Sequence, residues 1–142
     1  MNTTLRSATG FDLTPPTAAE HADLARALTR EEAEVLLHHG TEAPFCGGLL
    51  DNKENGVYAC RLCGLPLFHA RTKFESGTGW PSFNDPVAGA TETTTDRSHG
   101  MTRVEVHCAN CGSHLGHVFD DGPPPTHQRY CINGVAMNFK PD

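Results

Sequence analysis

The chain has 142 residues, a usual size for one domain, and its net charge of −6 is a poor match to the phosphates of nucleic acid. No apolar run is long enough for a transmembrane helix, and the N-terminus lacks the basic and then apolar pattern of a signal peptide. We therefore expect a cytoplasmic protein that binds neither nucleic acid nor membrane. In that reducing compartment its six cysteines are more typical of metal ligands or catalysts than of disulfides.

The N-terminal section predicts a loose segment followed by a short helix. Residues 1–26 are expected to form a flexible arm that includes some helix, and residues 27–142 to form a single domain. Thr29 and Glu32 have the spacing of a capping box, in which each side chain accepts from the backbone N–H of the other residue. The helix that follows should stop at Gly40.

From residue 41 onward the pattern changes to short strands separated by glycine and proline turns. Val104 and Val106 alternate with polar residues, as in a half-buried strand whose valines face the core. We expect strands at 56–59, 102–107, 117–119, 129–132 and 135–139. The predicted fold class is therefore mainly β, with antiparallel sheets, short connections and a short N-terminal helical section.

Four of the six cysteines form two matched knuckles with the spacing Cys-x-x-Cys-Gly. Zinc takes four ligands in a tetrahedron, and two residues between cysteines let one tight turn present both sulfurs to the same ion. Because four thiolates leave no open position, such a zinc is structural rather than catalytic. We predict one Zn2+ per chain, with the ligands Cys60, Cys63, Cys108 and Cys111. A redox Cys-x-x-Cys pair or simple buried thiols are the alternatives.

The other two cysteines stand alone, and Cys131 has polar neighbours. Strand alternation puts Arg129, Cys131 and Asn133 on one face. A guanidinium beside a cysteine lowers the thiol pKa and favours the nucleophilic thiolate. His114 and His117 precede this strand, although single histidines are more often surface residues or spare metal ligands. From the residues alone, Cys131 can equally be a reactive thiol or a buried apolar residue.

The only tryptophan lies in a glycine-rich segment. Gly77 and Gly79 allow a sharp backbone path around Trp80, since glycine adopts positive φ without a steric cost. Trp80 and Phe83 can be core residues or can form the wall of a small apolar pocket. Their spacing does not decide between these two roles.

Several long blocks of the sequence resemble the signature blocks of the methionine-R-sulfoxide reductases of the B type. The blocks are GTGWPSF at 77–83, DRSHGM at 96–101, HLGHVFDDGP at 114–123 and RYCIN at 129–133. The resemblance extends over about residues 27–141 and includes both cysteine knuckles. It implies two antiparallel sheets in a tent-like arrangement, with the zinc remote from the active site.

The resemblance also implies an enzyme that reduces the R epimer of methionine sulfoxide, free or within proteins. By position, Cys131 would attack the sulfoxide sulfur, while Trp80 and Phe119 would contact the substrate. The polar residues around the thiol would be His114, His117, Asp121, Arg129 and Asn133. Such groups can bind, polarise or protonate the sulfoxide oxygen, and the attack leaves a sulfenic acid on the cysteine. We expect the enzyme to be a monomer.

The chain departs from the common pattern of this family at the residue that would regenerate the thiol. Many members carry a second cysteine between the two glycines of Gly-x-Gly-Trp, where this chain has Thr78. Cys46 is the other thiol outside the zinc site. We expect Cys46 to form a disulfide with Cys131, and thioredoxin to reduce it, as the family implies. The alternative is that Cys46 is a small buried residue.

Two other classes of protein are also compatible with parts of the sequence. A non-enzymatic zinc-ribbon module would account for the knuckles, but the acidic charge argues against nucleic acid and Cys131 would be left unexplained. A general thiol peroxidase also uses an activated thiolate. Stereospecific turnover of a sulfoxide would distinguish a reductase from such a peroxidase.

Overall fold

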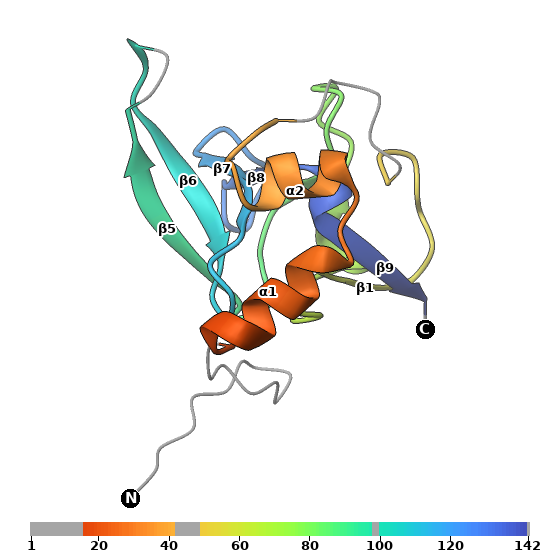
Figure 1. The fold of residues 1–142 in the computed structure, drawn as a ribbon. Helices are drawn as coiled ribbons and strands as arrows, with labels where there is room; N and C mark the ends of the chain where they lie inside the picture. The colour runs from red at the N-terminus through yellow and green to blue at the C-terminus, as the bar shows by residue number, and fades with distance from the viewer. Residues whose placement is uncertain (1–15, 42–48, 98–99, 142) are drawn as a thin grey trace, which may run out of the picture.

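The computed structural model describes residues 16–41, 49–97 and 100–141 (Figure 1). The described residues form two antiparallel sheets and two short helices, which confirms the predicted fold class. The two helices are α1 (Ala18–Arg26) and α2 (Arg30–Leu36). No helix in the described ranges has both the length and the hydropathy that a membrane crossing requires.

The sheets contain three and six strands, in the orders β2-β1-β9 and β3-β4-β8-β7-β6-β5. The strands of the smaller sheet are β1 (Gly56–Cys60), β2 (Pro66–His69) and β9 (Met137–Pro141). The strands of the larger sheet are β3 (Lys73–Phe74), β4 (Ser82–Phe83), β5 (Thr91–Asp96), β6 (Arg103–Cys108), β7 (His114–Phe119) and β8 (Arg129–Ile132). The prediction placed Val135 in the last strand, which was wrong, because Val135 lies in the 3-10 turn that precedes β9.

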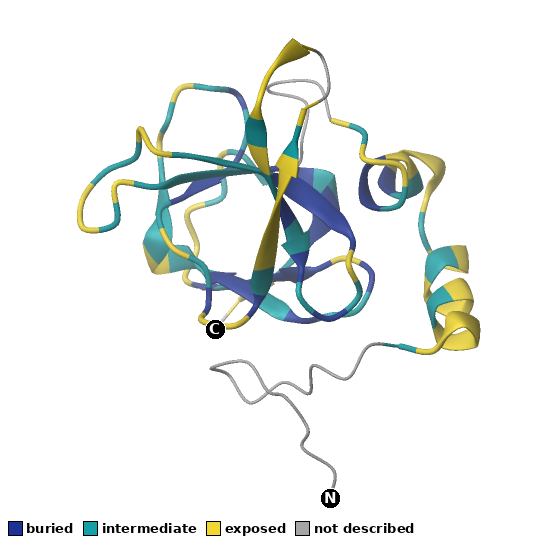
Figure 2. Cartoon of the chain, turned by 90° about the vertical axis from the view of Figure 1, so that its left-hand side faces the viewer, coloured by how far each residue is buried: buried dark blue, intermediate teal, exposed yellow. Residues whose placement is uncertain are grey.

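Both helices begin with a capping box. In α2 the pair is Thr29 and Glu32, as the sequence predicted, and in α1 it is Thr17 and Glu20. No residue of α1 is buried, and Figure 2 shows this helix at the edge of the molecule. Helix α2 instead contacts β7 and the turn before β9, so it is the helix that packs on the core.

The end of α2 differs from the prediction that Gly40 forms the stop. The helix ends at Leu36, and the residue with left-handed backbone is His39, with φ of 57°. Glycine is needed at position 40 because the backbone there lies close to the Glu34 carbonyl. Its N–H donates to the Glu34 carbonyl over 2.9 Å, and an added Cβ would lie 2.9 Å from the same oxygen.

Aromatic side chains hold the two sheets together. Phe68 of β2 stacks on Phe83 of β4 with ring centroids 4.4 Å apart, and Tyr58 of β1 meets Phe83 edge-on at 5.1 Å. All three side chains are fully buried, so Phe83 is a core residue rather than a pocket wall. Because β4 also pairs with β8, this packing supports the strand that carries Cys131.

Strand β6 does not follow the predicted burial pattern. Val106 is fully buried, but Val104 is 41% exposed, so the prediction that both valines face the core was wrong. Figure 1 shows the physical reason, since β5 and the start of β6 form a hairpin that extends beyond the rest of the molecule. The polar residues that alternate with these valines, Arg103 and Glu105, are half-buried instead.

A β-bulge brings His114 and His117 to the same side of β7. Alternation along a regular strand puts residues three apart on opposite faces. Val106 of β6 pairs with Gly116, but the next residue of β6, His107, pairs with His114, so Leu115 is the extra residue of a bulge in β7. As a result, the rings of His114 and His117 lie 5.6 Å apart.

The backbone of β8 lies close to Gly116 of β7, and we expect Gly116→Ala to be strongly destabilising. An added Cβ would lie 2.0 Å from the Cys131 carbonyl oxygen, so the strands must separate, at a cost of about 3 kcal/mol or more. Denaturant unfolding measures this loss. Gly77→Ala is the control, because its Cβ meets no atom within 4 Å. That variant should lose only the free energy of placing alanine at positive φ, about 1–2 kcal/mol. Equal losses of unfolding free energy in both variants would contradict a steric clash between the added Cβ and the Cys131 carbonyl oxygen.

Candidate active site

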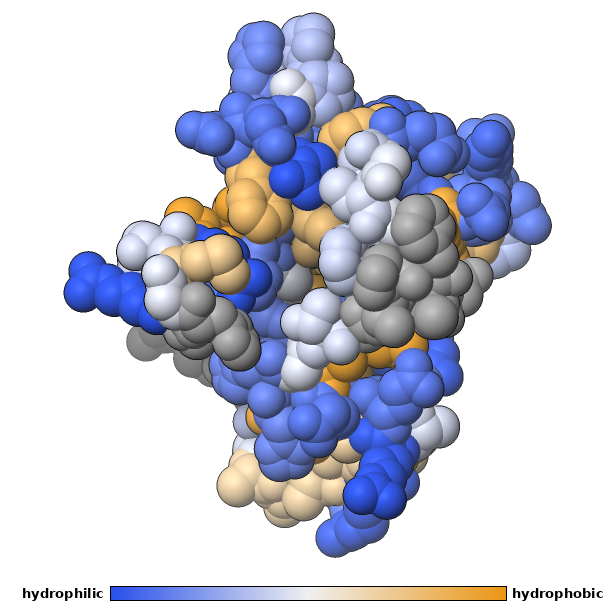
Figure 3. Space-filling model, turned by 90° about the horizontal axis from the view of Figure 1, so that it is seen from above, coloured by the Kyte–Doolittle hydropathy of each residue, from blue (hydrophilic) through white to orange (hydrophobic). Residues whose placement is uncertain are grey.

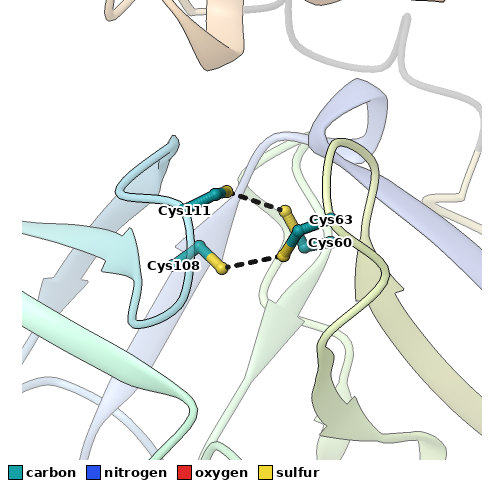
Figure 4. A group of neighbouring side chains, drawn as sticks. All are labelled: Cys60, Cys63, Cys108 and Cys111. Carbon is teal, nitrogen blue, oxygen red and sulfur yellow. Dashed lines mark hydrogen bonds between the residues drawn. The ribbon is translucent and has the colours of Figure 1, made fainter. Parts of the chain in front are cut away.

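The four knuckle cysteines come together where the two sheets meet (Figure 4). Cys60 is the last residue of β1 and Cys108 is the last residue of β6. The Sγ atoms of Cys60 and Cys111 lie 3.7 Å apart, and those of Cys63 and Cys108 lie 3.5 Å apart. A tetrahedral zinc with bonds of ~2.3 Å places its sulfurs about 3.8 Å from one another. The four thiols therefore fit a metal ion of this kind.

The two knuckles have the same backbone turn. Gly64 and Gly112 have φ of 83° and 76°, and each donates its N–H over 2.9 Å to the carbonyl of the first cysteine of its knuckle. An added Cβ would meet nothing within 4 Å at either position, so glycine is required for its conformation rather than for space. Hydrogen bonds among the thiols raise the pKa of Cys60 and Cys108 and lower that of Cys63 and Cys111. Four thiolates this close together would repel one another, so they need a cation.

A cavity of about 270 Å³ lies beside the half-buried Cys131. Six residues that the sequence singled out line it: Trp80, His117, Phe119, Arg129, Cys131 and Asn133. His114 and Asp121 are not among the lining residues, and neither are the four knuckle cysteines. Figure 3 looks onto the end of the molecule that bears the β5–β6 hairpin and shows a hollow with both hydrophobic and hydrophilic residues around it.

The register of the larger sheet determines which side chains stand next to the thiol. Cys131 of β8 is directly opposite His117 of β7 and Ser82 of β4. His117 is in turn opposite Glu105 of β6. Because paired residues project from the same face of a sheet, this row carries the thiol, an imidazole and a carboxylate on one side.

The guanidinium of Arg129 is held in place from two directions. Its Cζ lies 4.4 Å from the centroid of the Phe119 ring, a cation–π contact. Its Nε and Nη2 donate to the two carboxylate oxygens of Asp121 over 2.8 and 3.1 Å. The same bonds lower the pKa of Asp121, and Arg129 also interacts with the Cys131 thiol. Asp121 therefore binds Arg129 and does not line the cavity.

Asn133 and the bulge residue Leu115 are bound to each other. The backbone N–H of Asn133 donates to the Leu115 carbonyl over 2.9 Å, and its side-chain Nδ2 donates to the same oxygen over 3.0 Å. Asn133 is buried, so these bonds fix its amide at the edge of the cavity. The sequence pattern placed Asn133 beside Cys131, and the bulge determines how it is held.

Each histidine of β7 is bound to a carboxylate from a neighbouring strand. His117 Nε2 lies 2.8 Å from Asp96 of β5, and His114 Nδ1 lies 2.6 Å from Glu105 of β6. His114 is only 1% exposed, and this burial lowers its pKa although Glu105 acts in the opposite direction. The sequence identified both histidines, but it did not identify either carboxylate as a partner.

A chain of hydroxyl groups holds the loop that carries Trp80. The Ser76 Oγ lies 2.8 Å from the Thr78 Oγ1 and 2.7 Å from the Ser82 Oγ. The glycines on either side of Thr78 have φ of 75° and 90°, which confirms the sharp backbone path that the sequence predicted. Both Thr78 and Trp80 line the cavity, so the pocket-wall interpretation of Trp80 agrees with its position.

Several residues of the site were not identified from the sequence. Thr41 and Arg103 line the cavity, while Glu105 binds His114 and Asp96 binds His117. The sequence signal for Arg103 and Glu105 is their place as polar residues of the alternating strand around Val104 and Val106, which by itself does not indicate a role in the site. Cys46 lies outside the described residues.

The comparisons with known proteins agree with this geometry. The model of the SelR domain matches residues 28–141, which is most of the chain. The chain belongs to the SelR domain family. Curated relatives named "Peptide methionine sulfoxide reductase MsrB" include those of Caulobacter vibrioides and Xylella fastidiosa (strain M23). They are 65% and 58% identical to this chain, over 94% and 92% of it and 84% and 85% of their own lengths. The Escherichia coli relative of the same name is 51% identical over 82% of this chain and 86% of its own length.

Removing the Arg129 charge should make Cys131 less reactive. In Arg129→Gln the thiolate loses its neighbouring cation, so alkylation by iodoacetamide at neutral pH should slow by about tenfold. The rate is measured with the modified cysteine identified by mass spectrometry. Arg71→Gln removes an exposed arginine of the 3-10 turn after β2 and serves as the matched control. Equal alkylation rates in both variants would exclude a role for Arg129 in activating the thiol.

Proposed function

We propose that this protein reduces the R epimer of methionine sulfoxide to methionine, with Cys131 as the nucleophile. The main support is the position of Cys131 in a cavity that Trp80, Phe119 and Arg129 line, in a SelR domain chain with relatives named as methionine sulfoxide reductases. An apolar wall beside a thiol and a guanidinium suits a substrate that has a methyl group and a polar S–O bond on one sulfur.

In the first step the thiolate of Cys131 attacks the sulfoxide sulfur. The attack forms a bond between the two sulfurs while the sulfoxide oxygen takes up a proton. The oxygen then moves to the cysteine sulfur as the sulfur–sulfur bond and the original S–O bond break, so that methionine leaves and Cys131 becomes a sulfenic acid. The sulfoxide sulfur gains two electrons and the cysteine sulfur loses two. His117 and Asn133 line the cavity and can bind or polarise the oxygen, while Arg129 stabilises the thiolate before the attack.

The handedness of the reaction follows from the three groups on the sulfoxide sulfur. The indole of Trp80 offers an apolar surface for the methyl group, and the polar residues of β7 and β8 offer contacts for the oxygen. The rest of the methionine then extends out of the cavity in the one direction that remains. A sulfoxide of the opposite configuration exchanges the methyl and oxygen positions, so its oxygen meets the indole and loses its polar partners.

Regeneration is proposed to use Cys46. Its thiolate attacks the sulfur of the Cys131 sulfenic acid, which forms a disulfide and releases water. The dithiol of thioredoxin then reduces the disulfide by exchange and returns both cysteines to the thiol form. Support for Cys46 comes from the sequence, because Thr78 stands where many members of the family carry the second cysteine.

We further propose that the four knuckle cysteines hold one structural zinc ion. The Sγ separations of 3.5 and 3.7 Å support this, as do the two matching turns. Zinc bound by four thiolates has no open position, so the ion would join the ends of β1 and β6 and take no part in the reduction. We assign residues 27–142 to the catalytic domain and expect a monomer in the cytoplasm, where thioredoxin is reduced.

A single-turnover assay without external reductant tests the reduction. Reduced protein is mixed separately with the R and S epimers of a methionine sulfoxide substrate, and methionine and free thiols are counted. We expect about one methionine per chain and the loss of two thiols from the R epimer only. Release of no methionine from either epimer would exclude the proposed function, and equal release from both would exclude the stereospecificity.

Two variants assign the thiols in this assay. Cys46→Ser should still release about one methionine per chain from the R epimer, but should lose only one thiol and recycle slowly with thioredoxin. Cys131→Ser should release none. Full thioredoxin-driven recycling by Cys46→Ser would remove Cys46 from the mechanism and leave the first step intact.

Metal analysis tests the cysteine cluster. Purified protein should contain about one zinc per chain, and Cys108→Ser should lose it together with several kcal/mol of stability, since a structural zinc contributes directly to folding. Cys131→Ser is the matched control and should keep both the zinc and the unfolding temperature. A wild-type protein that unfolds at the same temperature with and without a chelator, after its zinc content is shown to change, would contradict the structural role.

A further inference from the structure

Glu105 is a carboxylate shared by three histidines from different parts of the chain. Its Oε2 lies 2.6 Å from His39 Nδ1 and 2.6 Å from His114 Nδ1, and His107 Nε2 lies 3.5 Å away. The Glu105 side chain is only 12% exposed, unlike an ordinary glutamate on a surface strand. Burial acts to raise the pKa of Glu105, but the bonds from His39 and His114 outweigh it and lower the pKa. Glu105 is therefore an ionised acceptor within the protein.

The bond to Glu105 determines which nitrogen of His114 carries the proton. A carboxylate only accepts, so the Nδ1 of His114 must be the donor. Burial lowers the pKa of His114 and favours the neutral ring, in which the proton on Nδ1 leaves Nε2 with a lone pair. That Nε2 is buried and has no hydrogen-bond partner in the described part of the chain. His114 therefore offers an acceptor beside His117.

The other bond of Glu105 ties the chain after α2 to the larger sheet. His39 adopts φ of 57°, and its ring lies 5.3 Å from that of His114. Two residues farther along, Thr41 lines the cavity beside Cys131. The Glu105–His39 bond thus ties the chain to the larger sheet two residues before this part of the cavity wall.

The short distances favour a hydrogen-bonded anchor over a metal site. Two nitrogen or oxygen ligands of a tetrahedral zinc, at 2.0–2.2 Å from the ion, lie about 3.4 Å apart. The two Nδ1 atoms are each 2.6 Å from the same Glu105 oxygen, which is a charge-assisted hydrogen-bond distance. The carboxylate itself is the centre of this cluster.

We propose that Glu105 is a positioning residue for the reduction: it holds His114 in the tautomer protonated on Nδ1, and through His39 it holds Thr41 in the wall of the substrate cavity. The inference rests on the proposed function, since it adds a residue that acts through others in that reaction. Glu105 itself does not line the cavity, so it makes no contact with the substrate.

Glu105→Gln tests the inference, because it keeps the shape of the side chain and removes the charge. The single-turnover rate of methionine formation from the R epimer should fall about tenfold to a hundredfold, as expected for the loss of charge-assisted bonds. In wild-type protein, the 15N spectrum of the histidine rings should show His114 protonated on Nδ1, and the variant should show a mixture of tautomers. Glu92→Gln removes an exposed carboxylate from the neighbouring strand β5 and should change neither result.

His39→Gln separates the two parts of the proposal. It should leave the His114 tautomer as in wild type but raise KM several-fold, because only the wall at Thr41 loses its anchor. The proposal is overturned if wild-type His114 carries its proton on Nε2, a result that needs no variant to fold. It is also overturned if folded Glu105→Gln stays within twofold of the wild-type rate. Failure of wild-type protein to form methionine would refute the proposed function, while the tautomer measurement would still decide the role of Glu105.

Discussion

The contact between the two sheets is the interaction on which the rest of the structure depends. Phe68 and Tyr58 of the smaller sheet pack on Phe83 of the larger one, and burying aromatic rings of this size is the main source of free energy available to a small β domain. Phe83 is in β4, which pairs directly with β8 and its Cys131. The reactive thiol is therefore positioned by a strand that the core itself holds.

Polar contacts then arrange the side chains around that thiol. The pairing of β7 with β8 puts His117 opposite Cys131, and the bulge at Leu115 turns His114 to the same side. Each histidine is bound to a carboxylate of the β5–β6 hairpin. Because these bonds are buried or half-buried, they hold the rings more firmly than surface contacts do, and the hairpin becomes part of the site although it extends away from the core.

The cysteine cluster joins the same two sheets at a different place. Cys60 ends β1 of the smaller sheet and Cys108 ends β6 of the larger one, so a metal ion there would close a long loop of the chain. Strand β6 connects this cluster with Glu105, three residues before Cys108. The proposed zinc and the proposed positioning residue are thus on one strand.

Much of the fold and the site could be predicted from local patterns. The cysteine knuckles, the capping box of Thr29 and the strand around Cys131 depend on residues a few positions apart, so the sequence alone determined them. With the family resemblance, it also identified four residues of β7 and β8 that line the cavity: His117, Phe119, Arg129 and Cys131. The burial of β6 was predicted wrongly, because alternation shows which residues share a face but not what that face meets.

The tertiary structure decided the contacts between distant segments. The bulge at Leu115, the pairing of Glu105 with His39 and His114, and the place of Thr41 in the cavity wall join parts of the chain that no local spacing relates. Their physical cause is the register between strands, which depends on the packing of the whole sheet rather than on any one segment. The sequence by itself therefore determined the chemical groups of this protein, and only the folded sheets decided which of those groups touch.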